Sequence, residues 1–182
     1  MFAPERMPTT AIDDHDPATS RDIAFCNDLD VSRDGRRIYF SEPFAWPGAS
    51  MGGGAFREAI ALGRNGRLWL VDLERGTVSL VAQDYTFIDG VLLEYGPKPG
   101  AREQSVLVSE TVKFRILRLD LDGTRDEVLW DSLPGLPDGL DRDAQGRVWV
   151  GLVKTRCIPP TSISRSAGFT ACRIRRYSRP MV

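Results

Sequence analysis

Histidine and cysteine are scarce in this 182-residue chain, which contains one histidine and three cysteines. With His15 alone, chemistry that depends on a histidine, such as a Ser-His-Asp triad, has little basis. The cysteines, Cys26, Cys157 and Cys172, do not make the disulfide framework of a small secreted domain. We therefore expect a reduced, cytoplasmic setting, although three cysteines also permit one disulfide.

The chain also lacks an excess of one charge and any long apolar segment. Lysine and arginine total 24, aspartate and glutamate total 25, and the formal net charge is −1, so no nucleic-acid surface is predicted. The longest apolar runs have the length of a strand, which argues against a membrane-spanning helix. Residues 1–22 are polar and acidic and have no signal-peptide core. The partner that we expect is a small-molecule substrate.

What the chain does contain is a repeat. Three segments begin with an apolar residue, a spacer, and then Asn27, Asp89 or Asp138 at the third position. Each segment continues as an alternating strand and leads to a second strand. The two strands of the first unit start within residues 25–31 and 38–42. Those of the second start within residues 87–93 and 106–110, and those of the third within residues 136–142 and 148–152. Such repetition places one oxygen-bearing side chain at the same point of every unit.

The first two units each have four short strands separated by turns that contain glycine. They are predicted at residues 28–32, 37–42, 67–72 and 77–82, and at residues 90–93, 105–110, 114–120 and 127–130. A third unit begins at residues 139–142 and 147–152. Four-stranded antiparallel units that recur in this way predict an all-β fold, a β-propeller of which about two and a half blades are present. An ordinary β-sandwich would not explain the matching first residues.

The interval between Asn27 and Asp89 is longer than the 49 residues between Asp89 and Asp138. The surplus lies in residues 43–64, where three glycines precede a helical stretch at residues 55–62 that ends at Gly63. We interpret this insertion as a lid or a loop helix. Trp46, in the same insertion, is a candidate for contact with a substrate.

The two ends of the chain differ from the repeats. Residues 153–182 contain seven basic residues and no acidic one, and they lose the alternation of strands. We therefore divide the chain into an irregular N-terminal segment (1–21), a partial propeller (22–156) and a basic, irregular tail (157–182) that is not native to the fold. A closed propeller needs at least about four blades, so the repeats predict an incomplete one.

The motifs together resemble the strictosidine synthase-like proteins of the SMP-30/gluconolactonase/luciferin-regenerating superfamily. The resemblance is carried by Phe25-Cys-Asn-Asp-Leu-Asp-Val31, Leu133-Pro-Gly-Leu-Pro-Asp-Gly139 and Gly146-Arg-Val-Trp-Val-Gly-Leu152, and it covers residues 22–156. It implies a six-bladed propeller, of which this chain is the middle portion. It also leads us to expect a truncated or frameshifted reading frame.

Asn27, Asp89 and Asp138 hold the start of the innermost strand in successive blades, and this position faces the central channel. One amide and two carboxylates form a hard-oxygen set that suits Ca²⁺ first, or Mg²⁺. The resemblance implies that all three are metal ligands, although the family more often has Asn where Asp89 stands. A further glutamate ligand of the family has no match here. The alternative is that these side chains only bond the neighbouring backbone, as Asx-turns do.

A metal at this position would suit a hydrolase of small lactones or esters, with Asp89 or Asp138 as the catalytic base. Two alternatives remain open: an amine–aldehyde condensing enzyme like strictosidine synthase, and a propeller fragment without activity. Asp28 and Asp30 are interpreted as residues that solvate the strand end or support the ligands.

Several other charged residues are assigned structural positions. Glu42 and Glu110 end equivalent strands and are predicted to bond Thr111 or a neighbouring backbone. The alternating cations Lys113, Arg115 and Arg118 predict a solvated face of a strand.

Overall fold

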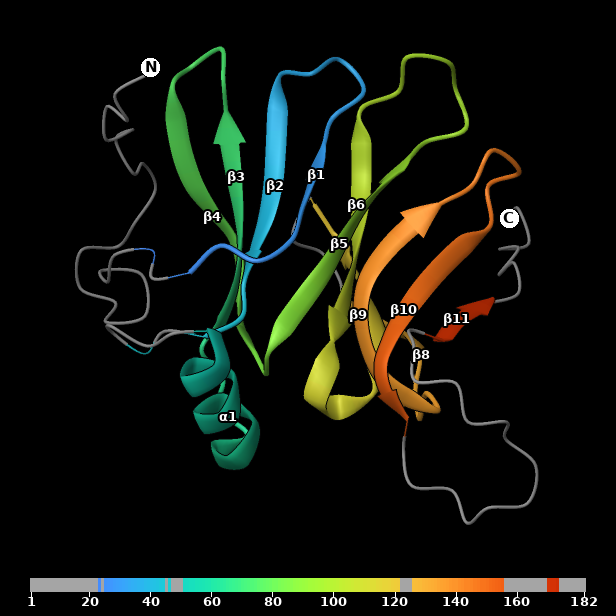
Figure 1. The fold of residues 1–182 in the computed structure, drawn as a ribbon. Helices are drawn as coiled ribbons and strands as arrows, with labels where there is room; N and C mark the ends of the chain where they lie inside the picture. The colour runs from blue at the N-terminus through green and yellow to red at the C-terminus, as the bar shows by residue number, and fades with distance from the viewer. Residues whose placement is uncertain are drawn as a thin grey trace, which may run out of the picture.

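The computed structural model describes residues 23, 25–44, 46, 51–121, 126–155 and 170–173. Within these ranges the chain forms three antiparallel sheets that stand side by side around a common axis (Figure 1). None of the helices found there is both long enough and apolar enough to cross a bilayer. The predicted N-terminal segment 1–21 lies outside the described residues.

The first sheet contains four strands in chain order: β1 (Leu29–Val31), β2 (Arg37–Glu42), β3 (Gly66–Asp72) and β4 (Thr77–Tyr85). The second sheet repeats this order with β5 (Ile88–Tyr95), β6 (Glu103–Glu110), β7 (Arg115–Asp120) and β8 (Asp126–Trp130). A single 3-10 turn, η1 (Thr111–Lys113), joins β6 to β7. The four-stranded antiparallel blades predicted from the repeats are confirmed.

The third sheet contains β9 (Gly135–Arg142), β10 (Val148–Thr155) and β11 (Thr170–Arg173). β11 pairs antiparallel with β10, from Trp149 opposite Arg173 to Leu152 opposite Thr170. At these four residues the structure therefore differs from the irregular tail that we predicted. A short segment can join the free edge of β10 because that edge offers unpaired backbone groups. The rest of the tail, residues 156–169 and 174–182, lies outside the described residues.

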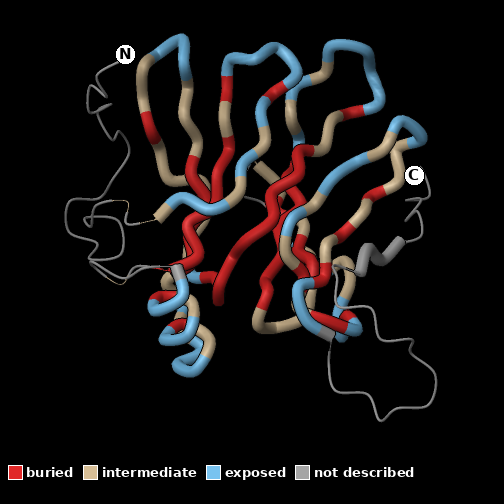
Figure 2. Tube along the Cα trace, viewed as in Figure 1, coloured by how far each residue is buried: buried red, intermediate tan, exposed pale blue. Residues whose placement is uncertain are grey.

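The hydrophobic core lies between neighbouring blades. One cluster joins the first and second blades, and its fully buried members include Leu68, Ile88 and Val106. A second cluster joins the second and third blades through Leu107, Ile116, Val148, Val150 and others. Successive residues of a strand point to opposite faces of the sheet, so Val106 and Leu107 serve different interfaces. Figure 2 shows buried residues along the inner parts of all three sheets.

A repeated ion pair links the ends of equivalent strands in the first two blades. Glu42 is paired with Arg67 (2.7 Å), and Glu110 is paired with Arg115 (2.5 Å). In both blades the two residues are direct partners across the second and third strands. The predicted structural role of the two glutamates agrees with these contacts, although the partners are side chains as well as backbone.

The prediction of a solvated cationic face on β7 is wrong. Arg118 is 14% exposed and lies 2.6 Å from Glu94, and Arg115 is 28% exposed beside Glu110. Both guanidinium groups lie over a neighbouring strand that supplies a carboxylate. The sequence does not reveal this because the partner is set by the pairing of β6 with β5 and β7.

The predicted helix is present as α1 (Met51–Ala61), four residues longer at its start than expected. Glycine normally disfavours a helix interior, but Gly54 touches the aromatic ring of Phe44, and any side chain at this position would overlap that ring. The glycines thus allow α1 to pack closely on the segment that follows β2.

Candidate functional site

The three predicted residues lie at the starts of the innermost strands β1, β5 and β9. Asn27 precedes β1, and its backbone N–H donates to the carbonyl of Ser41 at 3.0 Å. Asp89 is the second residue of β5, and Asp138 lies in the first half of β9. The repeat therefore places one candidate at or just before the start of the first strand of each blade, and Figure 1 shows these three strands side by side.

Three aromatic rings pack together close to these residues in the chain. Phe25 and Phe87, each two positions before a candidate residue, both pack against Phe44, with ring centroids 5.2 Å and 6.1 Å from it. Phe87 has φ of 50°, the left-handed region that non-glycine residues rarely occupy. Its carbonyl accepts a hydrogen bond from Thr111 N–H at 3.0 Å, which fixes the entry into β5.

The side chains of Asn27, Asp89 and Asp138 are in contact. The Asn27 amide Nδ2 donates a hydrogen bond to Asp89 Oδ1. Asp89 and Asp138 lie within hydrogen-bonding reach of each other, and Thr111 Oγ1 approaches Asp89 Oδ2 at 3.5 Å. The structure thus brings together all three residues that the sequence singled out.

Burial and negative charge dominate the electrostatics of the cluster. Asp89 is 5% exposed. Its burial, followed by the hydrogen bond and the charge of Asp138 and the charge of Asp28, raises the pKa of Asp89 to about 8. Among the described residues, neither Asp89 nor Asp138 has a cationic partner. At neutral pH the cluster holds a proton because two adjacent carboxylates cannot both be charged without a cation.

Two small residues hold the strands of Asp89 and Asp138 together. The Ser109 hydroxyl accepts a hydrogen bond from Gly90 N–H (2.7 Å) and donates one to the carbonyl of Asp138 (2.9 Å). A side chain at Gly90 would overlap the same carbonyl. Ser109 and Gly90 therefore fix the separation of the two carboxylates. Neither residue is marked as functional by the repeats in the sequence.

Asp28 and Asp30 bond the next blade. Asp28 Oδ2 accepts from Val91 N–H at 2.9 Å, and Asp30 Oδ2 accepts from Leu93 N–H at 2.8 Å. These bonds give partners to two backbone N–H groups on the inner edge of β5, which has no strand partner on that side. Asp28 also adds negative charge beside Asp89. The predicted supporting role of Asp28 agrees with this arrangement, while Asp30 acts on the strand edge.

The donor set of the cluster fits a divalent cation of the hard type. Two touching carboxylates offer four oxygens, and rotation of the Asn27 amide would add a fifth. A cation would also neutralise the charges of the buried Asp89 and the half-buried Asp138, which have no other cationic partner among the described residues. No group of three or more His, Cys, Asp and Glu side chains with metal-site geometry occurs in the described ranges. Here the third ligand would be an amide, which is not of these types.

The remaining candidates do not belong to the cluster. His15 is outside the described residues. Cys26 is an exposed free thiol, and the indole of Trp46 packs under the Arg57 guanidinium at 4.3 Å. A cavity of about 220 Å³ is lined by Tyr85, Glu110, Lys113, Arg115 and neighbouring residues, and none of the three cluster residues lines it.

Comparison with known sequences finds relatives over most of the chain. The adipocyte plasma membrane-associated protein of Salmo salar is 33% identical over 147 residues, covering 79% of this chain and 33% of that protein. Protein STRICTOSIDINE SYNTHASE-LIKE 10 of Arabidopsis thaliana is 30% identical over 139 residues, covering 74% and 34%. The chain therefore spans about a third of the length of the curated relatives it matches. No protein-family model matches the chain.

Comparison with solved structures gives the same fold. A structure of luciferin-regenerating enzyme aligns with 70% of this chain and 38% of its own, with a TM-score of 0.50 and 18% sequence identity. At this level of identity the similarity concerns the fold alone, and it agrees with the partial propeller described above.

Proposed function

Because the chain belongs to the strictosidine synthase-like branch of the SMP-30/gluconolactonase superfamily, of which it contains a part, we propose that its cluster is a divalent-cation site. Asn27, Asp89 and Asp138 are the proposed ligands, and Ca²⁺ is the cation that the oxygen donors favour, with Mg²⁺ second. In the complete propeller this site would serve the hydrolysis of small lactones or esters.

One observation carries the proposal: two carboxylates from different blades, the buried Asp89 and the half-buried Asp138, lie within hydrogen-bonding reach without a cationic partner among the described residues. An arrangement that served folding alone would place an arginine there, as both Glu42 and Glu110 have in their blades. Burying like charges costs stability, and proteins accept such costs at functional sites.

The chemistry of the cluster suits ester cleavage. A bound divalent cation would polarise the substrate carbonyl and lower the pKa of a water molecule. Either Asp89 or Asp138 would accept the proton that this water loses as its oxygen attacks the carbonyl carbon. The same pair would return a proton to the alcohol oxygen when the carbon–oxygen bond of the ester breaks. Thr111 would hold Asp89 in position through the contact of its Oγ1 with Asp89 Oδ2.

An amine–aldehyde condensing activity is the second candidate. It is supported by the similarity to a protein named strictosidine synthase-like. Such a reaction would proceed without a divalent cation, so chelation separates the two proposals.

The test uses the 182-residue chain with a panel of lactones and aryl esters, in Ca²⁺ and in EDTA. We expect hydrolysis in Ca²⁺, at least a hundredfold loss on chelation, and a similar loss in Asp138→Ala. Asp141→Ala is the control, since Asp141 lies on the same strand but is exposed. Hydrolysis that survives both EDTA and Asp138→Ala would exclude the proposed mechanism.

A further inference from the structure

Helix α1 exposes its large apolar side chains and buries its acidic one, which is the reverse of an ordinary surface helix. Its outward residues Phe56 and Ile60 are 67% and 68% exposed, and Leu62, just past its end, is 59% exposed. Its inward residue Glu58 is completely buried. A helix on a protein surface normally buries its apolar face and exposes its charges.

The orientation of α1 is fixed by specific contacts. Glu58 Oε1 accepts a hydrogen bond from Asn65 N–H at 3.1 Å, and Glu58 Oε2 accepts one from the Asn65 amide at 2.9 Å. On the same side, Gly54 sits directly against the ring of Phe44. Rotating the helix to bury Phe56 would break the Glu58 bonds and move Gly54 away from Phe44. The apolar face is therefore held outward by the fold.

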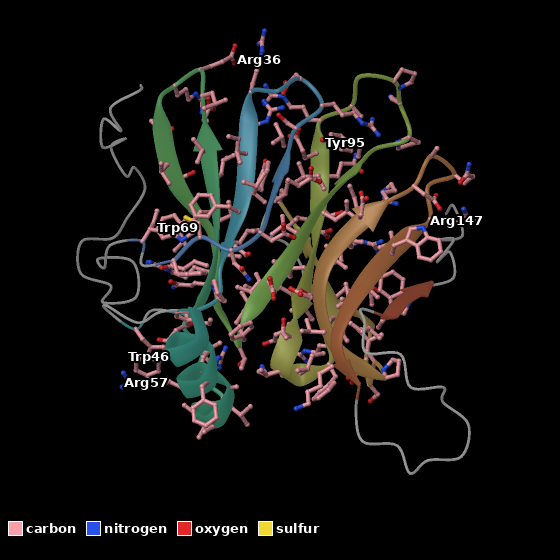
Figure 3. The ribbon with its side chains drawn as sticks, in the orientation of Figure 1. Arg36, Trp46, Arg57, Trp69, Tyr95 and Arg147 are labelled. Atoms are coloured by element: carbon pink, nitrogen blue, oxygen red, sulfur yellow. The ribbon has the colours of Figure 1, made fainter. Side chains whose placement is uncertain are left out.

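The exposed charges of the helical segment itself are positive, and the exposed Asp84 lies beside Arg64, whose Nε donates a hydrogen bond to the Asp84 carbonyl. Glu58 is the only acidic residue between positions 51 and 64, and it is buried. The exposed charges of the segment are Arg57 and Arg64. The Arg57 guanidinium lies over the Trp46 ring (Figure 3). An apolar stripe flanked by arginines and an indole is typical of helices that lie in the interface of an anionic bilayer.

We propose that the outward face of α1, formed by Phe56, Arg57, Ile60 and Leu62, binds the surface of an anionic lipid bilayer. The helix would lie parallel to the surface, with the apolar side chains among the acyl chains and Arg57 and Arg64 among the headgroups. Two copies of this chain are a poorer match, because a two-fold contact would bring the arginines of both copies together.

This surface lies at the same end of the molecule as the cluster. Gly54 of α1 touches Phe44, and the ring of Phe44 packs against the rings of Phe25 and Phe87, which precede Asn27 and Asp89. Docking through α1 would therefore bring the starts of β1 and β5 close to the lipid. The inference does not depend on the proposed hydrolase activity.

Sedimentation with vesicles tests the proposal, using phosphatidylcholine vesicles with and without 30% phosphatidylserine. All samples contain EDTA, so that neither cation bridging nor the cluster affects the result. We expect the chain to sediment with the anionic vesicles. The double variant Phe56→Ser/Ile60→Ser should bind at least tenfold more weakly, and Arg57→Gln/Arg64→Gln should lose most of the preference for phosphatidylserine. Leu73→Ser is the control, because Leu73 is 46% exposed in the turn at the other end of β3.

Three results would overturn the proposal. The first is equal binding by the chain and by Phe56→Ser/Ile60→Ser. The second is equal binding to vesicles with and without phosphatidylserine. The third is a dimer in light scattering that Phe56→Ser/Ile60→Ser abolishes, because α1 would then be an interface between copies. Circular dichroism of each variant checks that the sheets are intact.

Discussion

At the scale of single residues, Ser41 and Ser109 occupy the same position in successive blades but make different hydrogen bonds. Each hydroxyl accepts a hydrogen bond from the backbone N–H that follows a cluster residue, namely Asp28 N–H and Gly90 N–H. Only Ser109 also reaches the next blade, where it donates to the carbonyl of Asp138. Ser41 instead faces the carbonyl of Asp28 in its own blade, at 3.4 Å. Ser41 therefore bonds only within its own blade, whereas Ser109 connects the strands that carry two of the proposed ligands.

This difference predicts unequal effects of two matched substitutions on Ca²⁺ binding. Ser109→Ala should weaken Ca²⁺ affinity by about tenfold, because it frees the strand of Asp138 from the strand of Asp89. Ser41→Ala should change the affinity much less, although each variant loses about 1 kcal/mol of stability. Isothermal titration calorimetry measures the affinity, and urea unfolding in EDTA measures the stability. Ser109→Thr, which keeps the hydroxyl, should restore binding. Equal losses of affinity in the two alanine variants would show that Ser109 has no special positioning role.

A second prediction at this scale concerns the pH dependence of stability. The raised pKa of Asp89, about 8 against an ordinary 3.8, means that the folded chain holds a proton that the unfolded chain releases. In EDTA, this group's contribution to stability should therefore fall as pH rises from about 4 to about 8 and then level off. Asp89→Asn should remove this decline and be the more stable protein at pH 9, while binding no Ca²⁺. Thermal unfolding at pH 6 and pH 9 makes the comparison. A wild-type chain that gains stability relative to Asp89→Asn as pH rises would contradict the charge state described here.

The three cluster residues could be found from the sequence because repetition marks equivalent positions without any knowledge of contacts. Ser109 and Gly90 could not be found, since their importance depends on which carbonyl of the next blade lies opposite them. The same limit applies to Asp30. An aspartate on a short strand gives no sign of whether it meets water or the N–H of Leu93.

At the scale of elements, the strands follow from the alternation of apolar residues and from glycine turns, while α1 depends on one close contact. The helix was predicted from residue 55 because glycines ordinarily end or weaken helices. In the structure α1 begins at Met51 and includes Gly54. Glycine is needed at position 54 because the ring of Phe44 occupies the space that a side chain would take. The position of the helix is thus set by a ring that the sequence places ten residues earlier.

This contact predicts opposite effects of two glycine substitutions in the same helix. Gly54→Ala should destabilise the chain by about 1–3 kcal/mol, because Phe44 is buried and packs against the rings of Phe25 and Phe87, which leaves it little room to move aside. Gly52→Ala should stabilise α1 by up to about 1 kcal/mol, because nothing lies near that position. Urea unfolding gives both free energies, and hydrogen exchange at residues 55–61 reports the docking of the helix. A neutral Gly54→Ala would mean that α1 does not depend on Phe44 for its position.

At the scale of the whole molecule, no single blade contains the candidate site. Each blade supplies one side chain, and the cores between blades determine how closely the three approach. The repeats predicted this convergence from the general geometry of propellers. They did not predict β11, because the basic tail shows no alternation and its pairing depends only on the free edge of β10.

Calorimetric titration of the 182-residue chain with Ca²⁺ tests the central claim, a cation site built from three blades. We predict one Ca²⁺ per chain, and we predict that Asn27→Ala, Asp89→Ala and Asp138→Ala each weaken binding by at least tenfold while Asp141→Ala binds normally. A chain that takes up no Ca²⁺, or takes it up unchanged in all three variants, would contradict the account.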